Sequence, residues 1–178
     1  DMKPILDEVE KKMVINYSVD YCASRGEYLS AIVLAKKLGF EFVDAEKIMI
    51  FDVNGNFMSE QTNELVAKTL KDIKCAVIPG FYGADGTGSI HTFSRGGSDI
   101  TGAVVARAAD AVIYENWTDV DGFMSADPRI VENPTIIKKL SYKELRELAY
   151  MGANVLHPEA VFPVKASGIP INIRNTFN

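Results

Sequence analysis

The chain has 178 residues, of which 47% are hydrophobic and 24% charged, and these values are typical of one soluble globular domain. No apolar run approaches the roughly 18 residues that span a bilayer, and the formal net charge of -5 argues against a surface that tracks nucleic-acid phosphates. The two cysteines are far apart and lack metal-type spacing, which argues against a disulfide framework and favours a reducing cytoplasm.

The first half of the chain alternates predicted helices with predicted strands. In chain order these are a helix over 19–38, a strand over 40–43, a helix from 59 to about 74 and a strand over 75–79. Gly39 is expected to end the first helix as its C-cap, and Ser59 to cap the second. An Asn-Gly pair at 54–55 indicates a turn between them.

The second half continues the alternation. We expect a polar turn over 83–88 between extended segments, a helix of small residues over 98–109, a strand over 111–114, helices over 141–151 and 158–168, and a strand over 169–173. Ser141 and Glu144 have the spacing of a capping box, and Pro158 suits the first position of a helix. Strands and helices that alternate at these distances predict an α/β domain with a largely parallel sheet.

Residues 93–99, Phe-Ser-Arg-Gly-Gly-Ser-Asp, join a predicted strand to a predicted helix. In open α/β sheets ligands bind at this edge. Gly96 and Gly97 allow the backbone to approach a ligand, Arg95 offers a fork of donors, and the helix start offers unpaired N–H groups. These features predict an anion site. The alternative is a structural turn in which Ser98 caps the helix and Arg95 pairs on the surface.

A second polar segment, Thr-Asp-Val-Asp-Gly-Phe-Met-Ser-Ala-Asp-Pro-Arg at 118–129, follows the strand that is predicted to end at Tyr114. It therefore also falls at the ligand-binding edge of the predicted sheet. Its Asp-Gly and Asp-Pro pairs are ordinary turn signals when taken singly. Three aspartates, a proline and an arginine within twelve residues make this loop a second candidate binding segment.

Four strings resemble those of aspartokinases and occur in the same order, at 24–31, 93–99, 118–129 and 152–158. The Thr-Asp-Val-Asp-Gly part is similar to a loop found across the amino-acid-kinase superfamily, including glutamate 5-kinase and uridylate kinase. The strings at 24–31 and 93–99 resemble aspartokinases more specifically. The resemblance implies a three-layer α/β/α sandwich with a mainly parallel central sheet. It also implies transfer of the γ-phosphoryl group of MgATP to the β-carboxylate of L-aspartate.

The resemblance implies a substrate site made of five residues. Arg95 matches the arginine that grips the substrate α-carboxylate, and Glu27 the glutamate that holds its ammonium group. Phe81 matches a residue that lines the aspartate pocket. Asp99 matches an aspartate near the reacting groups, which orients a catalytic lysine, and Ser98 is close enough to contribute. Taken alone, a helix glutamate is by default a solvated residue, and a strand-end phenylalanine is more often plain core. An acid at a helix start has a purely structural alternative, because the helix dipole favours it.

The resemblance also implies a nucleotide site. Thr118 and Asp119 match positions near adenine and ribose, Arg129 faces the phosphates, and Asp127 supports the loop. Two further positions depart from the family pattern, in which a tyrosine and a phosphate-neutralising lysine are common. Met124 replaces the tyrosine and can still pack on a base, whereas Asn154 replaces the lysine without its charge.

Aspartokinases begin with a strand that leads into Lys-x-Gly-Gly, and no such string occurs in this sequence. We therefore expect residues 1–178 to be a partial kinase domain that lacks N-terminal strands and the C-terminal regulatory ACT domains, and that is inactive alone. The implied reaction is in-line attack by an ionised carboxylate, without a general base, in a homo-oligomeric enzyme of lysine, threonine and methionine biosynthesis. Mg²⁺ would be held mainly through the ATP phosphates. The alternatives are another superfamily enzyme, such as one resembling glutamate 5-kinase, and a non-catalytic nucleotide-binding domain.

Overall fold

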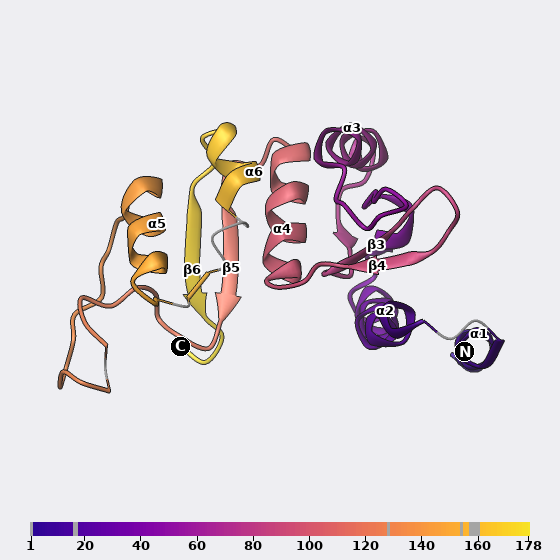
Figure 1. The fold of residues 1–178 in the computed structure, drawn as a ribbon, viewed down its shortest axis with the longest axis horizontal. Coiled ribbons are helices and arrows are strands. Elements are labelled where there is room, and N and C mark those ends of the chain that lie inside the picture. Colours follow the sequence, from indigo (N-terminus) through magenta and orange to yellow (C-terminus); the bar gives the residue numbers. More distant parts are fainter. Residues whose placement is uncertain (1, 16–17, 128, 154, 157–160) are drawn as a thin grey trace.

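The computed structural model describes residues 2–15, 18–127, 129–153, 155–156 and 161–178. Helices and strands alternate along most of the chain (Figure 1). Their order is α1 (Lys3–Ile15), α2 (Val19–Leu38), β1 (Glu41–Phe42), the 3-10 turn η1 (Ala45–Lys47), α3 (Ser59–Leu70), β2 (Ala76–Val77), β3 (Tyr82–Ala84), β4 (Ile90–Thr92), α4 (Gly97–Ala108), β5 (Tyr114–Thr118), α5 (Tyr142–Tyr150), α6 (Val161–Ala166) and β6 (Ile171–Asn175). No helix in these ranges has the length and apolar character that crossing a membrane requires.

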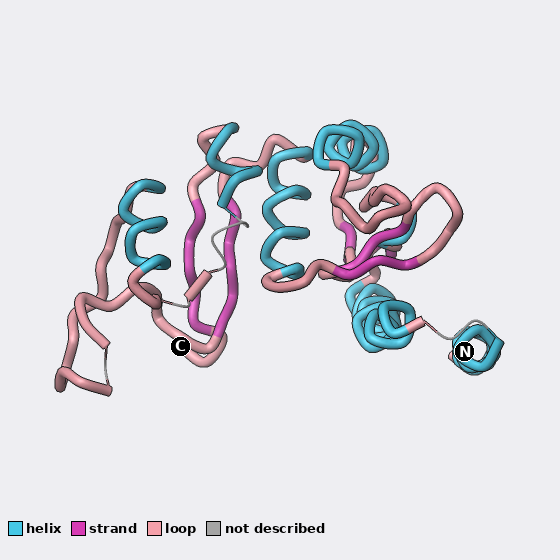
Figure 2. Tube along the Cα trace, in the orientation of Figure 1, coloured by secondary structure: helices cyan, strands magenta, loops and turns pink. Residues whose placement is uncertain are grey.

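The strands confirm the expected α/β class with parallel pairing. β1 pairs with β2 and β5 with β6, both in parallel, whereas β3 and β4 form an antiparallel hairpin around the polar turn expected at 83–88. Across the described residues these pairs are separate two-stranded ladders. The strands lie in two groups on either side of α4 (Figure 2). The helix α4 is therefore the element that joins the two halves of the molecule.

The small residues of α4 explain its central position. One side of the helix contributes Ile100 and Val104 to the larger buried cluster, which also contains residues of η1, β3 and α5. Its other side contributes Ala103 and Ala106 to a smaller cluster around Val164. Because the alanines add little bulk, α4 contacts β5 and α6 on this side and α3 on the other. The helix thus carries its N-terminal turn to a fixed place between the two strand groups.

Local signals predicted one helix boundary well and another poorly. Gly39 has φ 70° and ends α2, as expected, and its N–H donates to the carbonyl of Ala35. Ser59, however, does not cap α3, which begins at Ser59 itself and ends at Leu70 instead of about 74. The chain enters α3 through Met58, whose N–H donates to the carbonyl of Ile50 at 2.8 Å. This main-chain pairing, rather than a serine side chain, sets where the helix begins.

The strand expected over 111–114 is wrong by several residues, since β5 runs over Tyr114–Thr118. The apolar residues that suggested it are largely exposed, and Val112 is 90% accessible to solvent. β5 forms instead because Tyr114 to Thr118 pair in register with β6, which also begins two residues later than expected. The shift makes Thr118 the last residue of a strand, so the 118–129 loop starts directly at the carboxyl end of β5.

The predicted capping box of α5 is confirmed. The Ser141 hydroxyl accepts from the N–H of Glu144, and the Glu144 carboxylate accepts from the N–H of Ser141 at 2.7 Å. The bonds from Ser141, its hydroxyl first, lower the pKa of Glu144. Replacing Ser141 with alanine should therefore reduce the free energy of unfolding by about 1 kcal/mol, whereas alanine at the exposed Ser167 should change little.

Urea denaturation at several pH values tests this cap. A carboxylate whose pKa is lowered in the folded state stabilises it above its unfolded pKa, and this stabilisation is lost as the pH falls. The difference between the wild-type protein and Ser141→Ala should therefore shrink below a pH of about 4. A difference that is constant from neutral to acidic pH would show that Glu144 takes no part in the cap.

Candidate active site

The backbone after β2 makes a tight elbow at 79–83. Phe81 has φ 62°, a left-handed conformation that is rare for a residue with a bulky side chain. Its N–H donates to the Thr101 hydroxyl at 3.2 Å, and that hydroxyl donates to the carbonyl of Gly97 at 2.8 Å. Its carbonyl accepts from the N–H of Phe93 at 2.9 Å. The elbow is therefore held in a strained conformation by the start of α4 and the end of β4.

Glycines allow the elbow and the helix to approach each other. A Cβ atom at Gly80 would lie 2.9 Å from the Oγ of Ser98, and one at Gly97 would lie 2.6 Å from the Cβ of Phe81. Contacts this short essentially never occur for real Cβ atoms, so the backbones could not meet in this way with larger residues. Glycine is therefore required where the 93–99 turn meets the elbow.

The start of α4 differs from the structural alternative considered for the 93–99 turn. Its N-cap is Gly96, with φ 58°, and no side chain caps the helix, so Ser98 does not have the expected capping role. Arg95 is exposed and forms no ion pair with any other residue that the structure describes. The turn thus presents an uncommitted guanidinium beside helix N–H groups that no side chain occupies, an arrangement suited to an anion.

A cavity of about 450 Å³ lies between α2, β2 and α4. Glu27 of α2 and Ser98 of α4 both line it, although 70 residues separate them in the sequence. The remaining walls include Ala76 of β2 and Gly80 of the elbow. The described lining contains no lysine or arginine. Two of the five predicted substrate residues therefore meet at one cavity, while Phe81, Arg95 and Asp99 lie within three residues of its wall in the sequence.

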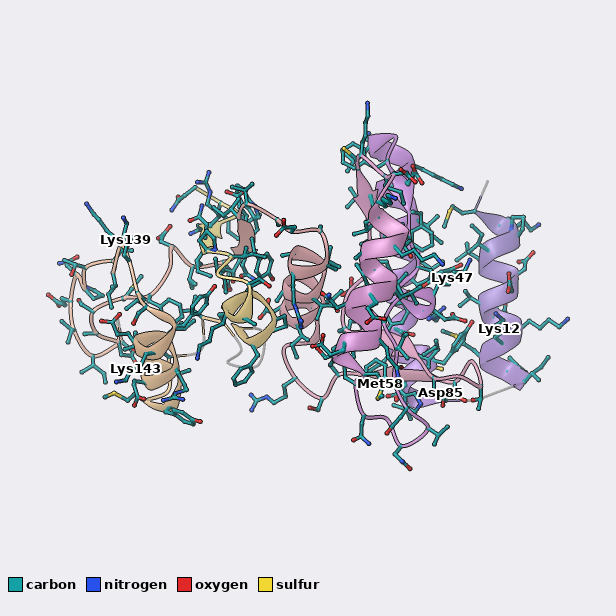
Figure 3. All side chains as sticks on the ribbon, turned by 90° about the horizontal axis from the view of Figure 1, so that it is seen from above. Lys12, Lys47, Met58, Asp85, Lys139 and Lys143 are labelled. Carbon is teal, nitrogen blue, oxygen red and sulfur yellow. The ribbon has the colours of Figure 1, made fainter. Side chains whose placement is uncertain are left out.

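Four lysines are labelled in Figure 3, and all of them lie away from this cavity. Figure 3 shows Lys139 and Lys143 on the α5 side of the molecule and Lys12 and Lys47 on the opposite side of α4. None of the four belongs to the cavity lining. On the turn that leads into α4, the cation nearest the cavity wall is Arg95, three residues before Ser98.

Two residues that the sequence did not single out hold Asp99. The Asn116 side-chain amide donates to the Asp99 carboxylate at 2.8 Å and to the Tyr114 hydroxyl at 3.2 Å. The Tyr114 hydroxyl in turn donates to the main-chain carbonyl of Asp99 at 3.2 Å, and burial raises the pKa of this phenol. A Cβ at Gly102 would lie 2.6 Å from that hydroxyl. β5 and the first turn of α4 are thereby joined by polar contacts.

Thr118 ends β5 at the base of the second candidate loop. Its hydroxyl donates to the Asp119 carboxylate at 3.2 Å, and its carbonyl accepts from both the N–H and the hydroxyl of Thr176. Asp121 accepts from the amide of Asn175 at 3.0 Å. The loop therefore starts from a position fixed against the end of β6.

In the later part of this loop, Asp127 and Arg129 form an ion pair at the surface. The Arg129 guanidinium donates to both carboxylate oxygens of Asp127, with a shortest distance of 2.6 Å, and these bonds lower the pKa of Asp127 to about 2. Met124 is half-buried and pairs through its backbone with Ile136. Asn154 lies outside the described residues. The predicted nucleotide residues that are described thus lie on or after β5, and none of them lines the 450 Å³ cavity.

The amino acid kinase family matches this chain over residues 3–175. The chain belongs to the amino acid kinase family. It is similar to the crystal structure of aspartate kinase from Clostridium acetobutylicum, with a TM-score of 0.94 and 54% identity over 100% of this chain and 41% of that one. Aspartokinase III of E. coli, in complex with aspartate and ADP, has a TM-score of 0.83 and 27% identity over 99% of this chain and 43% of that one. These likenesses confirm the fold and the resemblance to aspartokinases that the sequence motifs indicated.

Curated relatives of the chain carry the same names. Aspartokinase 3 of Bacillus subtilis (strain 168) is 38% identical over 169 residues, which are 90% of this chain and 37% of that protein. The chloroplastic aspartokinase 1 of Arabidopsis thaliana is 34% identical over 174 residues, which are 89% of this chain and 30% of that protein. This chain therefore spans less than half the length of each of these two relatives.

Proposed function

We propose that the protein carrying this chain transfers the γ-phosphoryl group of ATP to the β-carboxylate of L-aspartate. The observation that carries this proposal is the meeting of Glu27, from α2, with Ser98, from the start of α4, at one cavity. A carboxylate there suits a substrate ammonium group, and the adjoining Arg95 suits a substrate carboxylate. The aspartokinase III structure that this chain resembles was determined with aspartate and ADP, which supports the same pair of ligands.

In this proposal each side of the cavity binds a different part of aspartate. Glu27 holds the ammonium group, and Arg95 binds the α-carboxylate through two parallel hydrogen bonds. Phe81, fixed by the elbow, forms the wall beside the substrate carbons. The β-carboxylate then lies near Ser98 and Asp99. Discrimination against substrates without an amino group follows, because they would leave the Glu27 carboxylate without its partner.

The chemical step needs orientation and positive charge rather than a base. The substrate β-carboxylate is ionised at neutral pH and can attack the γ-phosphorus in line. Arg95 and the open helix N-terminus supply part of the required positive potential. The described lining has no lysine. We propose that residues outside this chain complete the cation set and that the chain alone does not turn over.

The nucleotide is proposed to bind after β5. Thr118 and Asp119, at the carboxyl end of that strand, would contact adenine and ribose, with the Met124 thioether packed on the base. Arg129, braced by Asp127, would face the phosphates. Mg²⁺ is proposed to arrive with ATP and to be held mainly by phosphate oxygens, as this ion commonly is in kinases. When bound there it would offset charge that develops during transfer.

We further propose that this reaction serves lysine, threonine and methionine synthesis in the cytoplasm. Phosphorylation of a carboxylate makes an activated acyl phosphate, which suits the first step toward those amino acids. A homo-oligomeric enzyme is also proposed, since large apolar side chains such as Val112 and Trp117 are exposed on the described surface.

The acceptor assay tests the proposed function. ADP release by the whole protein that carries this chain should depend on L-aspartate and should be at background with L-glutamate or UMP. The 178-residue chain alone should also remain at background. Faster turnover of glutamate or UMP would assign a different acceptor. Nucleotide binding by the whole protein without turnover of any acceptor would indicate a non-catalytic domain.

A further inference from the structure

Asn116 occupies an unusual place for an amide side chain. It is the middle residue of β5, it is only 8% exposed, and apolar or aromatic residues would satisfy a buried strand position more simply. Its amide nitrogen instead donates to the Asp99 carboxylate at 2.8 Å. Buried polar side chains are normally hydrogen-bonded. The partner of Asn116 is an acid of the candidate active site, which indicates a role beyond packing.

Tyr114 strengthens the same contact from the neighbouring position on this face. Residues 114, 116 and 118 alternate onto one side of β5, so the two residues that hold Asp99 share a face with Thr118. The Tyr114 hydroxyl accepts from Asn116 at 3.2 Å and donates to the carbonyl of Asp99. Gly102 leaves the space for that hydroxyl. Both the main chain and the side chain of Asp99 are therefore fixed from β5.

Within the described part of the chain, one oxygen of the Asp99 carboxylate accepts a side-chain hydrogen bond. Asn116 bonds to the Oδ1 atom of Asp99, whereas its Oδ2 atom has no hydrogen-bond partner among the residues that the structure describes. An amide donor sets the direction of the carboxylate, yet it carries no charge of its own.

We propose that Asn116, supported by Tyr114, is a positioning residue for phosphoryl transfer, which holds the Asp99 carboxylate in place and links β5 with the start of α4. The inference rests on the proposed function. Asn116 touches neither substrate nor nucleotide and acts through Asp99. Because Thr118 follows it by two residues on the same strand, the same bond also fixes the distance between the two candidate binding regions.

The test compares Asn116→Leu with Asn172→Leu in the whole protein. Leucine is close to asparagine in size and lacks the donor. Asn172 is a matched control, since it lies on the adjacent strand and donates to Glu115 outside the candidate site. We expect Asn116→Leu to lower kcat for aspartate about 10-fold while both KM values change less than about twofold. Asn172→Leu should leave kcat and both KM values unchanged.

A double-mutant cycle tests whether Asn116 acts through Asp99. If Asn116 acts only through Asp99, the variant with both Asp99→Asn and Asn116→Leu should be about as slow as Asp99→Asn alone. Independent losses that multiply, or an Asn116→Leu enzyme with normal kcat, would overturn the positioning role. If the wild-type protein shows no aspartate-dependent turnover, both the proposed function and this inference are wrong. If the wild-type protein turns over normally and Asn116→Leu is unaffected, only the inference is wrong.

Discussion

Alanine at position 97 should destabilise the protein by about 3 kcal/mol, because the added methyl group has no room. Its Cβ would lie 2.6 Å from the Cβ of Phe81 and 2.8 Å from the Cβ of Phe93. Both atoms are attached directly to the backbone, so neither can move away by a rotamer change. Phe81 is also at φ 62° already, which leaves the elbow little freedom to relax.

Gly26→Ala is the matched control for this change. Gly26 lies within α2, and a Cβ there would meet nothing within 4 Å. Alanine should therefore leave stability unchanged or raise it by about 0.5–1 kcal/mol, since it is the better helix former. Denaturant unfolding of both variants measures the contrast. Equal stabilities for Gly97→Ala and the wild-type protein would mean that the elbow and α4 do not pack as closely as described.

Features encoded by neighbouring residues were predictable from the sequence. The end of α2 at Gly39 and the capping box at Ser141 depend on side chains within a few positions of the element that they bound. The run of small residues over 98–109 likewise predicted a helix, and α4 runs over Gly97–Ala108. Such signals need no knowledge of the tertiary fold, which is why they held while the position of β5 did not.

The strand β5 shows what local patterns miss. Its sequence, Tyr-Glu-Asn-Trp-Thr, is more polar than the Ala-Val-Ile run just before it, which suggested the strand. The polar segment forms the strand because it pairs with β6 and because Asn116 bonds to Asp99. Both partners lie far from β5 in the sequence, so composition alone could not reveal that Asn116 is buried against α4.

In the candidate site, too, some features were predictable from the sequence and others were not. Motif order predicted Glu27 and Ser98 as members of one site, and both line one cavity. Nothing in either motif signals the left-handed backbone at Phe81, because phenylalanine rarely adopts it and the constraint comes from Thr101 and Phe93. The ion pair of Arg129 with Asp127 depends on loop geometry that residue types alone leave open.

The two candidate arginines should separate substrate binding from nucleotide binding. Arg95→Ala should raise KM for aspartate about 10- to 100-fold, the size of a lost charged hydrogen-bond pair, and leave KM for ATP nearly unchanged. Arg129→Ala should raise KM for ATP instead, by a smaller factor of about 3 to 10. Its effect is smaller because the wild-type guanidinium already bonds to Asp127 and must share its donors.

Arg107→Ala is the control for both, since Arg107 is at the other end of α4 and pairs with Glu60 at 3.1 Å. It should change neither KM, because exposed ion pairs contribute little and this one lies outside the site. Arg95→Lys refines the test: a lysine keeps the charge but cannot form the two parallel bonds, so only part of the aspartate affinity should return. Full recovery with lysine would mean that Arg95 acts through charge alone. An Arg95→Ala enzyme impaired for ATP instead of aspartate would reverse the assignment of the two binding regions.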